Sequence, residues 1–179
     1  MLEINPNFEP IRNYKDIISG FTLIDGSVAE FGVYNGGMTK ILAALDRPVW
    51  AFDTFEGMPY QEYYNDDYDS SNPPGKFRPD HDVIGFLNSL GNVVVQKGRF
   101  VDTLPNIPKD LVFSLVFLDC DYYLSHWQVF NYLEQQGHTA PGTIYLFDDY
   151  DLAGARAAID EWRGTRKFTH IHNYAVVTI

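Results

Sequence analysis

Two pairs of aspartates stand where two apolar stretches of the chain end: Asp119 with Asp121, and Asp148 with Asp149. Both stretches are typical of buried strands, and the carboxyl ends of neighbouring parallel strands open into one shared crevice where ligands bind. Carboxylates gathered in one crevice repel one another unless a cation or a proton joins them. The four residues therefore indicate a site for a hard divalent cation, such as Mg²⁺, Ca²⁺ or Mn²⁺, with a candidate general base beside it. The alternative is that they are separate helix caps and surface acids.

A glycine-rich turn follows the first expected strand and opens a helix; its residues are 30–37. Glycines let the backbone approach a ligand closely, but their spacing here differs from the G-x-G-x-x-G pattern that seats a pyrophosphate. Glu30, at the end of the strand, is a poor neighbour for a diphosphate and favours a cationic ligand, such as a sulfonium or an amino group. The alternative is a tight turn beside a solvated glutamate.

Two further loops follow strands of the same expected sheet. Asp53 ends the second strand about 20 residues after the glycine-rich turn, where an acidic residue commonly binds ribose hydroxyls. A helix cap is the alternative for this residue. The loop 96–105 follows the third strand and is expected in the same crevice, close to where an adenine could rest. Taken alone, it is a loop with a turn glycine.

The elements that must position these residues alternate along the chain. Strands are expected at 28–33, 49–52, 93–96, 112–117, 143–147, 168–172 and 174–179, and helices at 39–45, 83–90, 127–135 and 152–162. This alternation predicts an α/β fold, with about seven mostly parallel strands and helices on both faces of the sheet. The last two strands follow each other too closely for a parallel connection, which predicts one antiparallel edge strand.

The chain is expected to form a single domain over residues 1–179. Residues 1–27 form an N-terminal arm, with a weak helix or turn at 15–24. The polar stretch 60–82 is long for a structureless connection, so it is interpreted either as a lid over the site or as a surface insertion.

The composition excludes several classes of function. A formal net charge of −11 argues against nucleic acids and anionic membranes as partners, because both need a basic surface. The lone Cys120 excludes an internal disulfide and fits a reducing cytosol. The sequence also shows neither a signal peptide at its N-terminus nor an apolar run of the roughly 20 residues needed to cross a bilayer. We therefore expect a cytoplasmic protein, and a homo-oligomer is compatible with the sequence.

Five motifs, in this order, resemble those of the macrocin O-methyltransferase family, whose members are metal-dependent S-adenosylmethionine enzymes that methylate sugar hydroxyls of natural products. The motifs are residues 29–37, 52–59, 97–105, 118–125 and 141–150. The run Asp-Thr-Phe-Glu-Gly-Met-Pro at 53–59 is the most distinctive of them. The resemblance covers roughly residues 28–162 and implies a class I methyltransferase, or Rossmann-like, sheet. Family members usually have a longer N-terminal segment than the about 27 residues before the first strand here.

The resemblance also implies a role for each motif. The residues expected to bind S-adenosylmethionine are Glu30, Gly32, Tyr34, Asn35, Gly36, Gly37, Asp53, Thr54, Gly98 and Arg99. Glu30 and the glycines would hold the methionine part, and Asp53 the ribose. Asp119, Asp148 and Asp149 would hold Mg²⁺ or another hard divalent cation, and Asp121 would be the general base.

Two residues after the first aspartate pair are candidates for substrate contact. His126 lies one helical step beyond Tyr123 and Ser125, a spacing that would let it face the mouth of the crevice, and Tyr123 and His126 are both candidates for substrate contact. His126 also stands where the resemblance leads us to expect a small hydroxyl residue, after Ser125, which would alter substrate contacts. The alternative for His126 is a structural histidine, which is the more frequent role of a lone histidine.

The sequence thus predicts a Mg²⁺-dependent and S-adenosylmethionine-dependent O-methyltransferase. Its acceptor would be a sugar or polyol hydroxyl on a small molecule or glycan, with no nucleic acid or membrane as partner. A catechol-type metal-dependent O-methyltransferase is the alternative among enzymes. A catalytically idle binding module that kept the fold is the alternative of another class.

Overall fold

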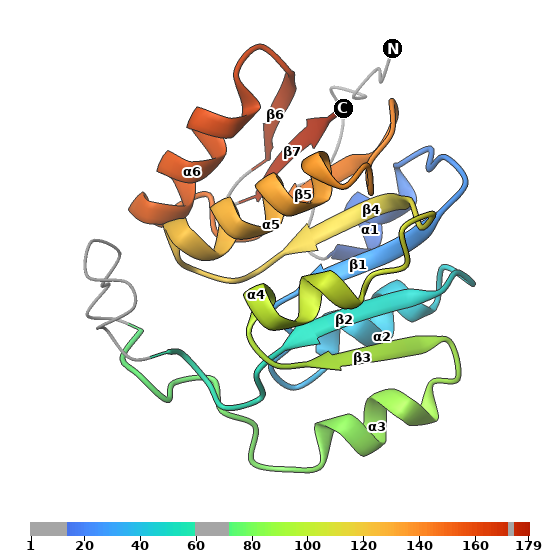
Figure 1. Ribbon diagram of the computed structural model, residues 1–179, viewed down its shortest axis with the longest axis vertical. Coiled ribbons are helices and arrows are strands. Elements are labelled where there is room, and N and C mark those ends of the chain that lie inside the picture. The colour runs from blue at the N-terminus through green and yellow to red at the C-terminus, as the bar shows by residue number, and fades with distance from the viewer. Residues whose placement is uncertain (1–13, 60–71, 172–173) are drawn as a thin grey trace.

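The computed structural model describes residues 14–59, 72–171 and 174–179, and these form one seven-stranded sheet (Figure 1). The strands are β1 Ser27–Phe31, β2 Val49–Asp53, β3 Val93–Lys97, β4 Phe113–Leu118, β5 Ile144–Phe147, β6 Lys167–Ile171 and β7 Tyr174–Thr178. Their order across the sheet is β3-β2-β1-β4-β5-β7-β6. The strands β1 to β5 pair in parallel, and β7 pairs antiparallel with both β5 and β6.

The chain begins its sheet in the middle and builds outward in both directions. From β1 it passes to β2 and β3 on one side, and it then returns to β4 and β5 on the other side. The strand order therefore reverses between β1 and β4, and a crevice for ligands is expected beyond the carboxyl ends of these two strands.

Helices cover both faces of the sheet (Figure 1). They are α1 Tyr14–Ser19, α2 Gly37–Ala43, α3 Val83–Ser89, α4 Phe100–Thr103, α5 Tyr123–Gln135 and α6 Ala153–Arg163, with a 3₁₀ turn at Leu104–Asn106. One face packs against α5, α6 and the 3₁₀ turn, and the opposite face packs against α1, α2 and α3. In the part of the chain that the structure describes, no helix is both long enough and apolar enough to span a bilayer.

The central strands are rigid because they are apolar and covered on both sides. All residues of β1 and β4 are buried, and successive side chains point to opposite faces. Phe31 stacks on Phe52 of the neighbouring strand at 4.6 Å between ring centroids, and Phe130 of α5 stacks on Trp162 of α6 at 4.2 Å. Burying each such side chain contributes about 1.5–3 kcal/mol, which stabilises the sheet and the helices packed on it.

The predicted fold class is confirmed, including the antiparallel pairing at one edge. The antiparallel strand β7 lies one place inside that edge, between β5 and β6. The short helix α4 occupies part of the stretch expected as a loop, and α5 begins at Tyr123 rather than at residue 127. Residues 1–13 of the expected arm and 60–71 of the expected lid lie outside the described residues, so the single domain stays a prediction.

Candidate active site

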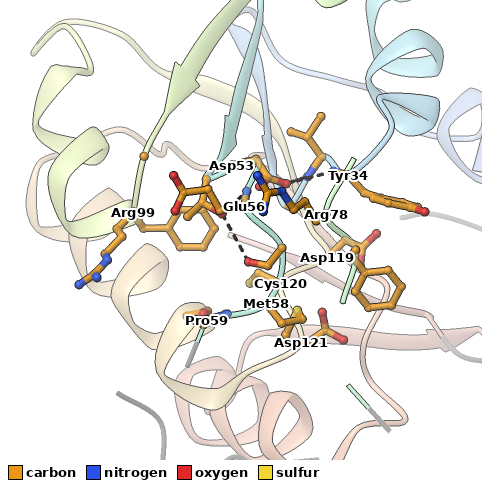
Figure 2. A pocket seen from close by; sticks show the side chains of 18 of the residues that line it. Tyr34, Asp53, Glu56, Met58, Pro59, Arg78, Arg99, Asp119, Cys120 and Asp121 are labelled. Carbon is orange, nitrogen blue, oxygen red and sulfur yellow. Dashed lines mark hydrogen bonds between the residues drawn. The ribbon is translucent and has the colours of Figure 1, made fainter. Parts of the chain in front are cut away.

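A cavity of about 900 Å³ opens at the carboxyl ends of the central strands (Figure 2). All four aspartates of the two pairs line it: Asp119, Asp121, Asp148 and Asp149. Of the residues expected to bind a cofactor, Gly32, Tyr34, Asp53, Thr54, Gly98 and Arg99 line it as well. The cavity therefore brings together the two halves of the site that the sequence predicts.

The glycine-rich turn lies directly against the end of β4. Gly32 has a φ of +90°, and a Cβ on this residue would lie 1.7 Å from the carbonyl oxygen of Asp119. The amide of Asp119 donates to the carbonyl of Phe31 at 2.9 Å, which continues the β1–β4 ladder to the rim of the cavity. Only glycine fits this close backbone approach. The turn is thus fixed next to the aspartates.

Asp53 ties together the loops that follow the first three strands. Its Oδ2 accepts hydrogen bonds from the amides of Val33 and Tyr34 at 2.7 and 3.0 Å. Its Oδ1 accepts from the amide of Phe55 at 2.7 Å, and its carbonyl accepts from the amide of Gly98 at 2.9 Å. The carboxylate therefore shapes the glycine-rich turn and also faces the cavity, where ribose hydroxyls could reach it.

Glu30 lies beneath the glycine-rich turn rather than in the cavity wall. Its side chain is fully buried, and its Oε2 accepts a hydrogen bond from the Thr39 hydroxyl. Its Oε1 is buried without a hydrogen-bond partner among the described residues. Burial raises the pKa of this carboxyl from 4.5 to about 8. An unsatisfied buried carboxyl oxygen beside the turn fits a ligand that carries a positive charge or a hydrogen-bond donor.

Three carboxylates meet at the ends of β4 and β5. Ligand atoms of Asp119, Asp148 and Asp149 all lie within 4.8 Å of one another. Burial, followed by the charges of the neighbouring carboxylates, raises the pKa of Asp119 and of Asp149 well above the ordinary value. This oxygen-only donor set fits a hard divalent cation, which would relieve the mutual repulsion of the three groups.

Asp121 lies beside these three carboxylates but outside the group that their ligand atoms form. Its backbone adopts the left-handed conformation with a φ of +58°, and its amide donates to Asp149 Oδ2 at 2.7 Å. Its own Oδ1 accepts a hydrogen bond from Asn72 Nδ2 at 2.6 Å. The residue lies in a turn beyond the end of β4, which turns its side chain into the cavity wall (Figure 2).

The expectation that His126 lies at the mouth of the crevice is wrong. The start of α5 turns this side chain toward the sheet, where it is fully buried against Phe130 and Phe147. Its Nδ1 donates to the carbonyl of Tyr122 at 2.9 Å, and burial lowers its pKa from 6.5 to about 4. His126 is therefore a neutral core histidine.

Four more residues that were expected at the site do not line the cavity. The Tyr123 hydroxyl donates to Glu161 of α6 at 2.8 Å, and this residue does not line the cavity. Asn35, Gly36 and Gly37 also stand outside the wall, in the turn and the first residue of α2. Gly36 has a φ of +76° at the N-cap of α2, so it allows the left-handed backbone of the turn before this helix.

Two residues that contact the aspartates were missed by the sequence analysis. The hydroxyl of Tyr14, on α1, donates to Asp148, and the Tyr14 ring packs edge-on against Phe117 at 5.4 Å. Asn72 holds Asp121, as described above. Both residues lie in segments without periodicity, the arm and the polar stretch, so no local pattern marks them. Glu56, Met58 and Arg78 also line the cavity and were not predicted.

Comparison with known proteins matches a family model over most of the chain. The family model described as macrocin-O-methyltransferase (TylF) matches residues 13–176. This range includes every residue of the candidate site described above.

Two curated relatives are similar in sequence. One is the 8-demethyl-8-(2,3-dimethoxy-alpha-L-rhamnosyl)-tetracenomycin-C 4'-O-methyltransferase of Streptomyces olivaceus, 28% identical over 79% of this chain and 59% of the relative. The other is the mycinamicin III 3''-O-methyltransferase of Micromonospora griseorubida, 26% identical over 78% of this chain and 61% of the relative. The chain thus spans about 60% of the length of these relatives.

A solved structure supports the fold. The crystal structure of CalS11, a calicheamicin methyltransferase, superposes with a TM-score of 0.75 over 87% of this chain and 72% of that chain. The two sequences are 20% identical, so this similarity concerns the fold alone.

Proposed function

The chain belongs to the macrocin-O-methyltransferase (TylF) family, and we propose that it transfers a methyl group from S-adenosylmethionine to a hydroxyl of a sugar or another polyol. One observation carries this proposal. The cluster of Asp119, Asp148 and Asp149 lies in the same cavity as Gly32 and Asp53, and Asp121 stands beside the cluster. A cation site, a candidate base and a candidate donor site therefore share one crevice.

The residues on the side of β1 to β3 fit the donor. Asp53 would accept hydrogen bonds from ribose hydroxyls, while Gly32 keeps the backbone open for the methionine part. The buried oxygen of Glu30 favours a positive charge above the turn, as on the donor's amino group. S-adenosylmethionine, when bound there, would supply the methyl group that the acceptor oxygen takes up.

The residues on the side of β4 and β5 fit the acceptor. Asp119, Asp148 and Asp149 would hold a divalent cation, which lowers the pKa of a hydroxyl bound to it. Asp121 would accept the hydroxyl proton at a carboxylate oxygen, because it lines the cavity without belonging to the cluster. Holding the acceptor oxygen and the donor in one crevice supplies a further large part of the rate.

The relatives support a sugar hydroxyl as the acceptor. Both curated relatives described above are named as O-methyltransferases of a numbered position, and the name of the first includes a rhamnosyl group. The aspartate cluster alone also fits a catechol, whose two adjacent oxygens could approach the same cation.

A panel of acceptors tests the proposal. Rhamnosides and other glycosides with vicinal hydroxyls would be compared with catechols, each with S-adenosylmethionine and with Mg²⁺ or EDTA. We expect mass gains of one methyl group on glycosides only, in the presence of Mg²⁺. Methylation of catechols with no glycoside product would favour the catechol-type enzyme.

A calorimetric titration separates both enzymes from an idle binding module. We expect S-adenosylhomocysteine to bind the wild-type protein in the presence of Mg²⁺. If neither S-adenosylhomocysteine nor Mg²⁺ binds, the assignment to methyl transfer is overturned. In that case the chain would have kept the fold of the family without its activity.

A further inference from the structure

Residues 72–78, here called the cap segment, contribute Gly75, Phe77 and Arg78 to the cavity wall, and the first residue of the segment contacts Asp121. The segment is fastened to the loop after β2 by two backbone hydrogen bonds, from Met58 to the carbonyl of Lys76 at 2.8 Å and from Gly75 to the carbonyl of Met58 at 2.9 Å. A Cβ on Gly57 would lie 2.6 Å from the carbonyl oxygens of both Gly75 and Lys76. This close packing of backbone on backbone fixes the position of the cap segment relative to the cavity.

Asn72, at the start of the cap segment, connects a cation with an anion. Its Nδ2 donates to Asp121 Oδ1 at 2.6 Å, and its Oδ1 accepts a hydrogen bond from the ammonium group of Lys76. The ammonium group can only donate and the carboxylate can only accept, so the two neighbours dictate which way the amide points. The side chain is also 6% exposed, which protects this arrangement from competition with water.

The cap segment reaches the donor side of the cavity as well. The Lys76 ammonium lies 4.6 Å from the centre of the Phe77 ring, and this ring packs edge-on against Tyr34 at 5.5 Å. The amide of Tyr34 in turn donates to Asp53. A continuous series of contacts therefore runs from the proposed ribose site to Asp121.

The turn after β4 places Asp121 in the cavity wall, and the hydrogen bond from Asn72 acts on the carboxylate itself. Asp121 lies in a turn of left-handed conformation, and its amide is hydrogen-bonded to Asp149 of the cluster. A carboxylate so close to three others could turn toward a bound cation and become a further ligand. The hydrogen bond from the Asn72 amide engages Asp121 Oδ1 and so opposes that rotation.

We propose that Asn72 is a positioning residue, which holds the Asp121 carboxylate toward the acceptor and out of the ligand set of the cation. The inference rests on the proposed function, because it gives Asp121 the role of base. Lys76 acts through Asn72 by fixing the orientation of the amide. Asn72 itself touches neither donor nor acceptor in this role.

Steady-state kinetics of Asn72→Ala and Asn72→Asp, with a glycoside that the wild type methylates, test the proposal. The aspartate keeps the size of the side chain and the acceptor for Lys76, but it cannot donate to Asp121. We expect kcat to fall roughly 10- to 100-fold in both variants, since small misplacements of a reacting group cost this much. The acceptor KM and the affinity for S-adenosylhomocysteine should stay within about twofold of wild type. Asn72 contacts neither molecule, so its replacement should not change how tightly they bind in the ground state.

The matched control is Asn106→Ala, which removes an exposed amide that donates to Gln96 Oε1 at 3.2 Å, away from the cavity. This variant should keep the wild-type kcat. A wild-type kcat in Asn72→Asp, or a fall in affinity equal to the fall in kcat, would overturn the positioning role.

A crystal structure of the wild type with S-adenosylhomocysteine and Mg²⁺ decides the matter independently of turnover. The proposal requires the Asn72 amide on Asp121 and the Asp121 carboxylate outside the coordination sphere of the cation. Asp121 bound to the cation would overturn it. Failure of the proposed function is a separate result, seen as a wild-type protein that binds S-adenosylhomocysteine in neither solution nor crystal.

Discussion

The α-carbon of Gly32 faces the carbonyl oxygen of Asp119 so closely that a Cβ would lie 1.7 Å from that oxygen. This contact joins the turn after β1 to the turn after β4, at the point where the strand order reverses. The proposed donor site and the acidic cluster are therefore parts of one backbone junction. A change at Gly32 must move one of them relative to the other.

Gly32→Ala should destabilise the protein strongly. The added methyl group meets backbone atoms that cannot turn aside, and the residue keeps a φ of +90° that disfavours alanine. We expect a loss of about 2–4 kcal/mol in the free energy of unfolding, measured by denaturant titration. Gly37→Ala is the matched control, because among the described residues no atom beyond its chain neighbours and its own helix backbone lies within 4 Å of its Cβ position. Equal stabilities of the two variants would contradict the junction.

Glu30→Gln should stabilise the protein without ligand, increasingly so as the pH rises. The folded-state pKa of Glu30 is raised from 4.5 to about 8, so its stabilising contribution is complete below pH 4.5 and is lost as the pH rises through about 8. Glutamine has no proton to lose. The variant should therefore match the wild type near pH 4.5 and exceed it by roughly 4–5 kcal/mol above pH 8.

Denaturant titrations at several pH values check this prediction. Glu56→Gln is the control, because Glu56 is an exposed carboxyl on the rim of the same cavity. A constant difference between Glu30→Gln and wild type across pH 4.5–8.5 would show that Glu30 ionises normally in the fold.

Most of the fold followed from local patterns, and the contacts around the aspartates did not. The runs that became β4 and β5 are apolar throughout, and each ends in an aspartate pair, so their position and direction could be predicted. Their neighbours Tyr14 and Asn72 lie 134 and 49 residues away in sequence from the aspartates that they contact. Such contacts depend on tertiary packing, which no sequence spacing encodes.

His126 shows the opposite kind of failure, because a pattern was present and pointed to the wrong face. The helix was expected from residue 127, but it begins at Tyr123, so His126 falls inside its first turn. A helix that starts earlier turns this residue toward the apolar sheet rather than toward the crevice. An error of four residues in one helix start was enough to change a proposed substrate contact into a core residue.

Tyr14→Phe should weaken cation binding at the cluster. The tyrosine hydroxyl donates to Asp148, and burial raises the Tyr14 pKa above its ordinary value, so the group stays protonated and able to donate. Partners that orient a ligating carboxylate typically contribute 10- to 100-fold in metal affinity, and we expect about tenfold weaker Mn²⁺ or Mg²⁺ binding by calorimetry. Tyr123→Phe removes a similar hydroxyl from Glu161, outside the cavity, and should bind the cation as wild type does. Equal affinities in the two variants would argue against a role for α1 at the cluster.

His126→Phe should change acid stability and leave substrate binding unchanged. In the folded wild type the pKa of His126 is lowered from 6.5 to about 4. The contribution of this histidine to stability is therefore complete above pH 6.5 and is lost as the pH falls through about 4. The stability of wild type relative to the variant should therefore fall by about 3 kcal/mol between pH 7 and pH 4. An increased acceptor KM in the variant would contradict this interpretation and indicate that His126 contacts the substrate.

The most direct test of the central claim is the rate of methyl transfer by Asp121→Asn, measured beside its affinity for S-adenosylhomocysteine and Mg²⁺. Asp121 lines the cavity and does not belong to the cluster of Asp119, Asp148 and Asp149, so the variant should bind both ligands within about threefold of wild type. Its turnover of the glycoside should fall by at least roughly 100-fold, because the hydroxyl proton has no acceptor. Near-wild-type turnover in Asp121→Asn would contradict the assignment of Asp121 as the base beside a cation site.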